Sequence, residues 1–461
     1  SHGFTLNNNQ LIGSDPKVRV LPPPDRLRRI LWLALPIIGG MVSQNVMNLV
    51  DTAMVGTLGD AALAAVGLGG FANFMFMALL LGLSVGVQTI TSRRKGEGRF
   101  EEMAVPLNGG LLILLCVAPP LSALLYFAVP AIYPWLNADP AVIEQGVPYL
   151  QARVLAMLFM GANFAFRGYW NAVDLPRLYM NTLIVMHASN IFLNWVLIFG
   201  NLGAPALGAH GAGIASAVST AVGFAIYVRL GLRHARAAGF LQKAPPRAEV
   251  AALFRLSLPT GIQQLFFATG FVITFWIIGQ VGTREMAAAS VILNLTLVAL
   301  LPGLGLGLAA ASLVGQSLGR LAPNEAYRWG WDVARVGMVG LALLGLPGAI
   351  WPELLLRVFI HDPETIAVAS LPMRLVGIGM AVEGLGVVMM HNLLGAGDAK
   401  RVMKVAVLSQ WVGFLPLAYV AGPMMGFGLT VIWTMQLGYR AAMAGVFTLF
   451  WLRRDWTRIK V

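Results

Sequence analysis

Charge is scarce in this sequence, and so are the residues that build soluble catalytic or metal centres. Only 11% of the 461 residues are charged, whereas a soluble domain has about 25%. The one cysteine, Cys116, rules out an internal disulfide, and its apolar neighbours predict a small core residue. The six histidines show no metal-ligand spacing, and the lack of a phosphate-binding glycine loop argues against an ATP-driven pump in this polypeptide.

Long apolar segments take the place of charge. Hydrophobic residues make up 57% of the chain and the mean hydropathy is +0.74, while a membrane-spanning helix needs about 20 apolar residues. Charged, Gly and Pro residues divide the chain into twelve apolar segments, which predict an all-α integral membrane protein with twelve transmembrane helices. The predicted helices are 30–55, 61–91, 103–130, 144–167, 177–200, 211–233, 250–280, 286–315, 326–349, 366–394, 401–421 and 427–452.

The basic residues gather in alternate loops. Most of the 32 Lys and Arg residues fall in every second loop and in the terminal segments, for example over 93–95, 229–255 and 453–454. Positively charged loops remain on the cytoplasmic side of a membrane. We therefore predict a multi-pass protein of the plasma membrane with both termini in the cytoplasm. The net charge of +12 then requires no nucleic-acid partner.

The second half of the chain repeats the first. An offset of 223 residues carries Pro36 onto Pro259 and Gly96 onto Gly319. Because six helices precede the return of the repeat, both copies have the same orientation, as in transporters built from parallel repeats. The predicted regions are an N-terminal cytoplasmic tail over 1–29, an N-lobe over 30–235, an inter-lobe cytoplasmic linker over 236–249, a C-lobe over 250–452 and a C-terminal cytoplasmic tail over 453–461.

One carboxylate interrupts the first apolar segment. Asp51 is the only charged residue between positions 30 and 55, and Gln44 and Asn48 precede it at helical spacing on the same face. An ionised Asp at the centre of a membrane helix costs about 2.5–3.5 kcal/mol, so such residues usually line an ion or substrate path. The alternative is a buried Asp that only hydrogen-bonds a neighbouring helix.

Two segments resemble the multidrug and toxic compound extrusion (MATE) transporters, in their bacterial NorM/DinF-like branch. Residues 35–56 read LPIIGGMVSQNVMNLVDTAMVG, similar to the first helix of that family. Residues 190–200 (NIFLNWVLIFG) and 203–215 (GAPALGAHGAGIA) resemble its fifth helix, the following loop and the sixth helix. The resemblance implies a monomer with two pseudo-symmetric six-helix lobes around a V-shaped cavity. It also implies export of cationic or amphipathic compounds against inward H⁺ or Na⁺.

The resemblance assigns a cation or proton site to the N-lobe. In some members the position of Asn194 is an Asp, so this chain has one negative charge fewer there. Na⁺ favours several anionic or carbonyl oxygens, whereas a single carboxylate suits a proton, and we predict H⁺ as the coupling ion. His187 shares a helix face with Asn190 and Asn194. The assigned residues are Asp51, Gln44, Asn190, Asn194 and Ser216.

The C-lobe departs from the family pattern. Glu383 matches an acidic position of the NorM-like branch, but the partner acid of that branch is replaced by Phe267. A two-carboxylate metal site is therefore in doubt, although Na⁺ at Asp51 or Glu383 stays open. Arg440 lies within a predicted helix, where it is either functional and paired or extended towards the membrane surface. The predicted cavity-lining residues are Asn48, His187, Gln263, Gln264 and Arg440.

These observations favour a secondary active multidrug antiporter without a cofactor, and not an enzyme. Its partners would be small amphipathic or cationic substrates and the lipid bilayer. One alternative is a lipid-linked oligosaccharide flippase of the same superfamily, a class with several cationic residues in its cavity. The other is an intramembrane enzyme, which needs a catalytic dyad or a metal cluster facing a cavity.

Overall fold

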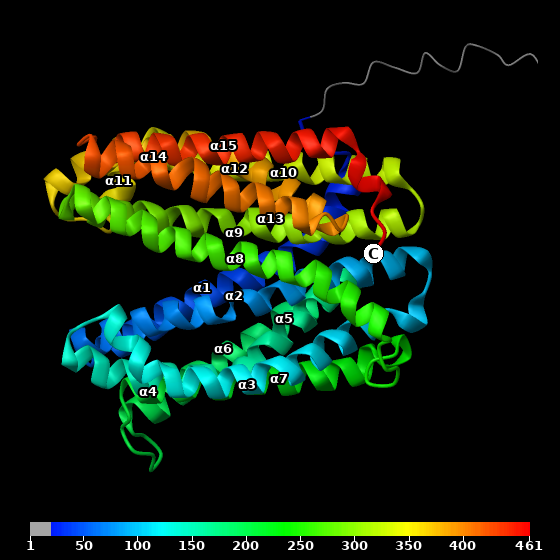
Figure 1. Ribbon diagram of the computed structural model, residues 1–461, viewed down its shortest axis with the longest axis horizontal. Helices are drawn as coiled ribbons and strands as arrows, with labels where there is room; N and C mark the ends of the chain where they lie inside the picture. Colours follow the sequence, from blue (N-terminus) through cyan, green and yellow to red (C-terminus); the bar gives the residue numbers. More distant parts are fainter. Residues whose placement is uncertain (1–19) are drawn as a thin grey trace, which may run out of the picture.

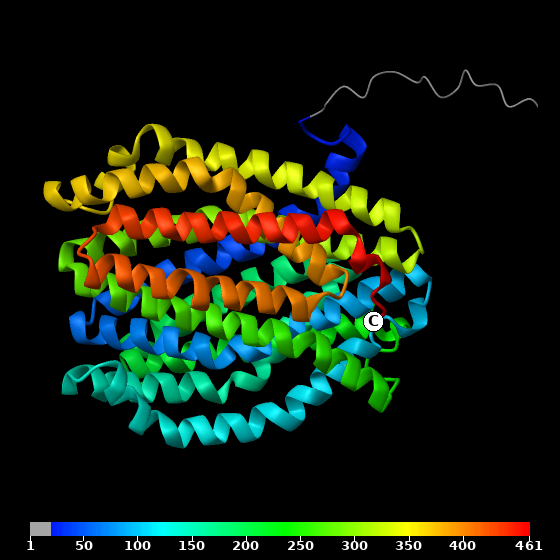
Figure 2. The same ribbon diagram turned by 45° about the horizontal axis from the view of Figure 1, so that its top comes forward.

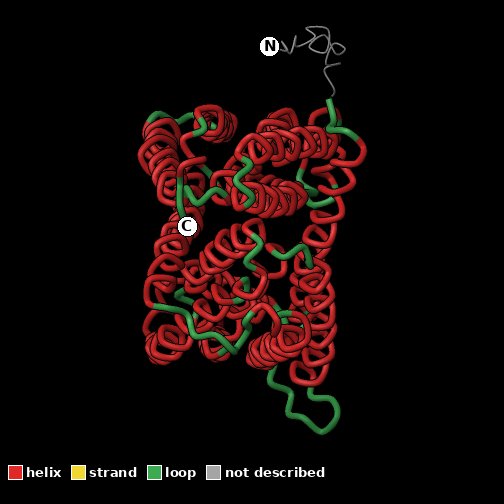
Figure 3. Tube along the Cα trace, turned by 90° about the vertical axis from the view of Figure 1, so that its right-hand side faces the viewer, coloured by secondary structure: helices red, strands yellow, loops and turns green. Residues whose placement is uncertain are grey.

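The computed structural model describes residues 20–461, and these residues form helices and connecting loops without a strand. Figure 1 shows the helices running along the long axis in two layers, one from each half of the chain. Seen end-on, the two halves form separate groups of helices (Figure 3). The predicted all-helical, two-lobe architecture is confirmed, and we use N-lobe for helices α1–α7 and C-lobe for α8–α15.

The N-lobe contains six spans. Helices α4 and α5 meet at an angle of 51° and together form one of them. The bounds are α1 (Pro24–Gly56), α2 (Asp60–Glu97), α3 (Val105–Leu136), α4 (Pro140–Leu155), α5 (Met157–Ala172), α6 (Pro176–Phe199) and α7 (Ala209–His234), with short 3₁₀ turns at Phe100–Glu102 and Arg236–Ala238.

The C-lobe contains six more spans. Figure 2 turns this lobe towards the viewer. Its helices are α8 (Arg247–Val281), α9 (Thr283–Gly319), α10 (Pro323–Ile350), the short α11 (Pro352–Arg357), α12 (Pro363–Gly395), α13 (Ala399–Leu408), α14 (Leu415–Tyr419) and α15 (Leu429–Arg453). The π-helical stretch Ser409–Phe414 joins α13 to α14, and a second one, Val420–Met424, extends this single span beyond α14. A 3₁₀ turn at Asp455–Arg458 follows α15.

The number of spans agrees with the predicted twelve. Within residues 20–461, ten helices are long and apolar enough to cross a membrane, and the bent pair α4–α5 makes eleven. The twelfth long helix, α15, falls short of that test because Gln436, Tyr439 and Arg440 lower its hydropathy. The first helix begins at Pro24, six residues before the predicted start at 30, and residues 1–19 of the predicted tail lie outside the described part.

The expectation for Cys116 was wrong. Its side chain is exposed on α3, where Leu112 and Leu115 are exposed as well. In a membrane protein the lipid-facing surface is as apolar as the core. An apolar run therefore shows that a segment is hydrophobic without showing which of its sides faces the protein.

The internal repeat extends to the helix caps. Asp139 accepts a hydrogen bond from the backbone N–H of Ala141 (3.0 Å) at the start of α4, and Asp362 caps α12 through the N–H of Glu364 (3.2 Å). In both helices proline follows the aspartate, and its missing N–H costs nothing in the first turn. The same offset of 223 relates Asp139 to Asp362, so the two lobes start these helices in the same way.

Glycine allows the two lobes to touch at their repeated positions. A Cβ atom on Gly96 of α2 would lie 1.9 Å from the backbone oxygen of Gln316, and one on Gly319 of α9 would lie 2.1 Å from that of Arg93. Gly96 and Gly319 are repeat partners, and so are Arg93 and Gln316. Helices α2 and α9 therefore cross backbone to backbone about a local two-fold relation, which a side chain at either glycine would prevent.

Hydrogen bonds repeat the same symmetry. The hydroxyl of Thr89 donates to the carbonyl of Leu394 (3.0 Å), and its repeat partner Ser312 donates to the carbonyl of Asn171 (2.8 Å). Helix α2 is thus hydrogen-bonded to the end of α12, and α9 is hydrogen-bonded to the end of α5, each in the other lobe. These buried hydroxyls satisfy carbonyls at the lobe interface and fix how the lobes meet.

The lobes are joined by polar contacts at one end only. We call this the basic end; it carries the turns at 98–104, 173–175, 235–246, 320–322 and 396–398 and the C-terminus (right in Figure 1). Arg26 of α1 donates to Asp332 (2.5 Å) and Glu325 (2.6 Å) of α10. Within residues 20–461, every hydrogen bond between the lobes comes from the half of the molecule nearest this end.

Asp174 is the centre of the largest cluster at the basic end. Lys95 and Arg29 (2.6 Å) donate to its carboxylate, and Gln316 reaches it from the C-lobe (2.9 Å). Burial by itself would raise the pKa of Asp174, but the hydrogen bond and charge of Lys95, the hydrogen bond of Gln316 and the charge of Arg29 outweigh it and lower that pKa. The carboxylate therefore stays ionised and holds two cations at the lobe interface.

The repeat partner of Asp174 has different surroundings. An offset of 224 carries Asp174 onto Asp398, whose one close cation among residues 20–461 is Arg401 (2.8 Å). Burial raises the pKa of Asp398, Arg401 opposes this rise, and the charge of Asp455 adds to it. The lobes thus share a backbone plan but differ in charge at the basic end.

The cluster predicts an acid-sensitive contribution to stability. Asp174→Asn should lower the free energy of unfolding at pH 7 by about 1–3 kcal/mol, because charge-assisted hydrogen bonds are lost. A lowered pKa stabilises the folded state above the unfolded-state value and loses that effect as the pH falls through the folded-state value. The melting temperatures of wild type and variant in detergent should therefore converge below about pH 4. A constant difference down to pH 3 would contradict this account.

Candidate functional site

The N-lobe site forms where α6 packs on α1. Asp51 lies about a turn and a half before the end of α1 at Gly56, so it is nearer the end opposite the basic end than the middle of the helix. The side-chain amide of Asn194, fully buried on α6, donates a hydrogen bond to the Asp51 carboxylate. Asp51 itself is only half-buried. The pair therefore joins a carboxylate with access from outside to a buried amide.

Helix α6 presents further polar atoms without partners. The side-chain oxygens of Asn190 and Asn194 and Nε2 of His187 are buried and form no hydrogen bond with any residue of 20–461. Buried polar groups normally have partners, so this row of atoms offers places for a proton, a water molecule or a cation. It continues from Asp51 along one face of α6 towards the basic end.

Other predicted members of the N-lobe site lie apart from Asp51. Gln44 donates to the side chain of Asn48 on its own helix (3.2 Å). Ser216 is buried on α7, where its carbonyl accepts hydrogen bonds from Thr220 and Ser219. Within the described chain, none of the hydrogen bonds joins Gln44, Asn190 or Ser216 to Asp51. The network expected around the carboxylate is thus a single pair, Asp51 with Asn194.

In the C-lobe, the predicted acid and the predicted arginine meet. Arg440 of α15 donates from Nε to both oxygens of Glu383 on α12 (3.1 and 3.2 Å) and from Nη2 to one of them (2.9 Å). The side chains are 17% and 9% exposed, so the pair is held away from water. Of the two alternatives for Arg440, the structure has the paired one. Glu383 also neutralises the charge of Arg440.

The glutamines of α8 lie elsewhere in this lobe. The amide of Gln263 is buried against the sulfur of Met390 (3.2 Å) and its oxygen has no partner within residues 20–461, while Gln264 is half-buried. Phe267 packs edge-on against Phe271, with 4.6 Å between ring centroids. The position where the family resemblance led us to expect an acid is therefore part of an aromatic contact, and the described residues hold no cluster of three or more Asp, Glu, His or Cys side chains.

Comparison with known proteins decides the family. The sequence profile of the MatE family matches residues 36–196 and 259–420, one match in each lobe. The chain belongs to the MatE family. This is a family of transporters and not of enzymes. The two matches also begin at Pro36 and Pro259, the residues that mark the repeat.

Relatives of this MatE-family chain resemble it over almost its whole length. It is 29% identical to the probable multidrug resistance protein NorM of Mesorhizobium japonicum over 444 residues, 93% of this chain and 94% of that protein. It is 25% identical to the multidrug resistance protein NorM of Aliivibrio fischeri over 447 residues, 94% of this chain and 96% of that one.

Solved structures of the family have the same fold. A multidrug resistance MATE transporter of the MOP superfamily, described in an outward-facing conformation, superposes with a TM-score of 0.85 at 19% identity and covers 97% of this chain and 100% of its own. A Vibrio cholerae MATE transporter in the bent form gives a TM-score of 0.83 at 18% identity, covering 93% and 97%. At this identity the likeness establishes the fold alone.

The sequence analysis missed a second arginine inside the protein. Arg167 was taken as the end of a predicted helix, but α5 continues to Ala172. Its Nε donates to the hydroxyl of Ser84 on α2 (3.0 Å), and no ion pair within residues 20–461 includes it. The available signal was its position in an apolar segment, since an arginine at such a depth is by default functional.

Proposed function

We propose that this MatE-family protein is a secondary active multidrug antiporter that exports cationic or amphipathic compounds in exchange for inward H⁺. The observation that carries the proposal is the lone Asp51 carboxylate held by the amide of Asn194, next to buried polar atoms without partners. The names of the NorM relatives support multidrug compounds as substrates.

Asp51 would couple the ion to the substrate by changing its charge. An ionised carboxylate in apolar surroundings attracts a cation, and protonation removes that attraction. When Asp51 takes a proton, its hydrogen bond with Asn194 weakens, because the amide then donates to a neutral carboxyl group instead of a carboxylate. The loss of negative charge releases a cationic substrate, and loss of the proton on the other side restores its binding.

The polar contacts at the basic end support an outward-facing state in which the lobes are joined on the cytoplasmic side. The basic turns favour the cytoplasm as their compartment, in the inner membrane of a bacterium. The ion pairs of Arg26 with α10 and the hydrogen bond from Gln316 to Asp174 cross the lobe boundary at this end and must part before the site can open there. The transporter would alternate between the two states as a monomer.

In the C-lobe, Arg440 supplies a fixed cation to Glu383. A buried carboxylate that is bonded at both oxygens has no free coordination for Na⁺ unless the arginine leaves. We therefore propose that ion coupling resides in the N-lobe alone. Such a single site with one carboxylate favours H⁺ over Na⁺, because Na⁺ needs several oxygen ligands.

The proposal is tested by export of a fluorescent organic cation from proteoliposomes in which H⁺ and Na⁺ gradients are imposed separately. We expect export with an inward H⁺ gradient in Na⁺-free buffer, and a Na⁺ response only in Asn194→Asp, which adds a second carboxylate beside Asp51. Asn201→Asp, in the exposed turn after α6, is the matched control and should show no Na⁺ response. Wild-type export that requires Na⁺ at equal pH would contradict the proton assignment.

A further inference from the structure

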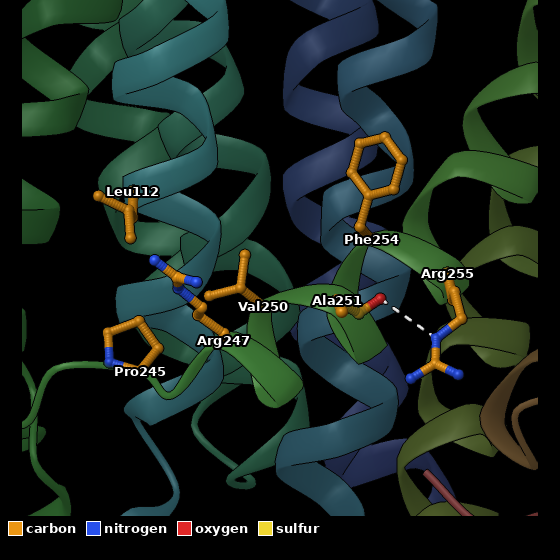
Figure 4. A pocket seen from close by; sticks show the side chains of 7 residues that line it. All are labelled: Leu112, Pro245, Arg247, Val250, Ala251, Phe254 and Arg255. Atoms are coloured by element: carbon orange, nitrogen blue, oxygen red, sulfur yellow. Dashed lines mark hydrogen bonds between the residues drawn. The ribbon is translucent and has the colours of Figure 1, made fainter.

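A groove opens on the surface between the two lobes near the basic end. It has a volume of about 530 Å³ and lies between α3, the start of α8 and the linker that precedes α8. Leu112, Pro245, Val250 and Phe254 form most of its apolar wall. In Figure 4, Leu112 and Pro245 face the first turn of α8, and Phe254 stands further along that helix. The volume falls in the range of sites that bind small molecules.

Two arginines flank the groove on α8. Arg247 projects towards Leu112 and Pro245, and Arg255 lies on the other flank of the same helix (Figure 4). Neither takes part in an ion pair within residues 20–461, and Arg255 donates weakly to the carbonyl of Ala251 (3.4 Å). The nearest acid on α8, Glu249, is bound to Arg94 at 2.6 Å. The groove is therefore positively charged without a carboxylate of its own.

The apolar wall continues into the membrane. Leu112 and Phe254 each lie seven residues after the start of their helices, about 10 Å along the axis. Their side chains are 44% and 47% exposed, as expected where a protein faces lipid chains. Charge at the membrane surface with an apolar channel beneath it matches the two parts of a phospholipid, a phosphate and an acyl chain.

We propose that this groove binds an anionic phospholipid of the leaflet at the basic end. Its phosphate would lie against Arg247, and an acyl chain would follow Val250, Phe254 and Leu112. Arg255, on the other flank of α8, would add positive charge beside the groove. Basic pockets between transmembrane helices recognise such head groups. Because α3 belongs to the N-lobe and α8 to the C-lobe, the bound lipid contacts both lobes. The inference does not depend on which substrate or ion is transported.

The test is lipid selectivity measured by native mass spectrometry of the purified protein in mixed phosphatidylglycerol and phosphatidylcholine micelles. Wild type should retain phosphatidylglycerol preferentially. The double variant Arg247→Gln, Arg255→Gln should reduce that preference about 25-fold, since each basic residue near the membrane surface strengthens binding of an anionic lipid roughly fivefold. Arg233→Gln with Arg328→Gln removes two exposed arginines of the same end away from the groove and should leave the preference unchanged.

A second variant tests the apolar half of the groove while keeping both arginines. Val250→Trp should fill the channel and weaken retention of phosphatidylglycerol. Soluble glycerol phosphate, added as a competitor, should not displace the lipid from wild type or from any variant. Circular dichroism and gel filtration confirm that each variant is folded. The proposal is overturned if the double arginine variant keeps the wild-type preference, or if glycerol phosphate displaces the lipid from wild type. The second result would indicate a site for a free anion.

Discussion

Asp51→Asn is expected to abolish ion-driven accumulation while leaving the protein folded in the membrane. Asparagine retains the shape of the side chain and a hydrogen bond to Asn194, but it does not titrate. Each elementary charge that moves down 100 mV contributes about 2.3 kcal/mol, so the substrate gradient should fall by roughly 50-fold per coupled charge. The measurement is substrate accumulation in inverted vesicles at a fixed H⁺ gradient.

Two variants make that result specific. Asp51→Glu keeps a titratable group and should retain part of the accumulation, whereas Asp60→Asn changes an exposed acid at the start of α2 and should behave as wild type. Binding of a cationic substrate in the absence of a gradient should be weaker in Asp51→Asn. Wild-type accumulation by purified, folded Asp51→Asn would refute a coupling role for this residue.

Arg440→Ala is expected to destabilise the protein strongly, and removal of Glu383 as well should restore much of the loss. Taking away one partner of a buried pair leaves an uncompensated charge, at a cost of about 3–5 kcal/mol. Arg440→Ala with Glu383→Ala carries no such charge. The melting temperature in detergent should therefore be lowest in Arg440→Ala and higher in the double variant.

The effect of Na⁺ on the melting temperature provides a second measurement. Without Arg440, the Glu383 carboxylate is free to bind Na⁺, so added NaCl should raise the melting temperature of Arg440→Ala more than that of the double variant or of wild type. Glu383→Gln has the opposite effect on charge: it leaves Arg440 unpaired and should weaken export of cationic substrates more than of neutral ones. Equal melting temperatures of Arg440→Ala and the double variant would show that the pair contributes packing and not charge compensation.

The spans of this fold were predictable because hydropathy and helix length are set by the membrane. Glycines and prolines that recur at a constant offset predicted the two lobes. Gly96 and Gly319 recur because the backbones of α2 and α9 come too close there for any side chain. What the pattern could not show was the direction in which each helix faces. Cys116 illustrates this, because apolar composition is the same towards lipid and towards the core.

The sequence named the residues of the candidate site, but their contacts could not be predicted from it. Asp51 and Asn194 were both named, yet their contact depends on how α1 and α6 rotate against each other. Glu383 and Arg440 were treated as separate features, since they are 57 positions apart in the sequence and one complete span lies between them. Gln44 has the expected helical spacing, but its side-chain amide donates to Asn48 on its own helix. A residue one turn away on the same helix is within reach of this amide.

The exposure of the one cysteine has a practical consequence for studying motion in this transporter. Replacing Cys116 with serine changes a surface position and yields a protein free of thiols. Spin labels or fluorophores can then be attached at any chosen pair of positions, one on each lobe, without further background reaction. Distances between such labels would follow the two lobes through the transport cycle in a lipid bilayer.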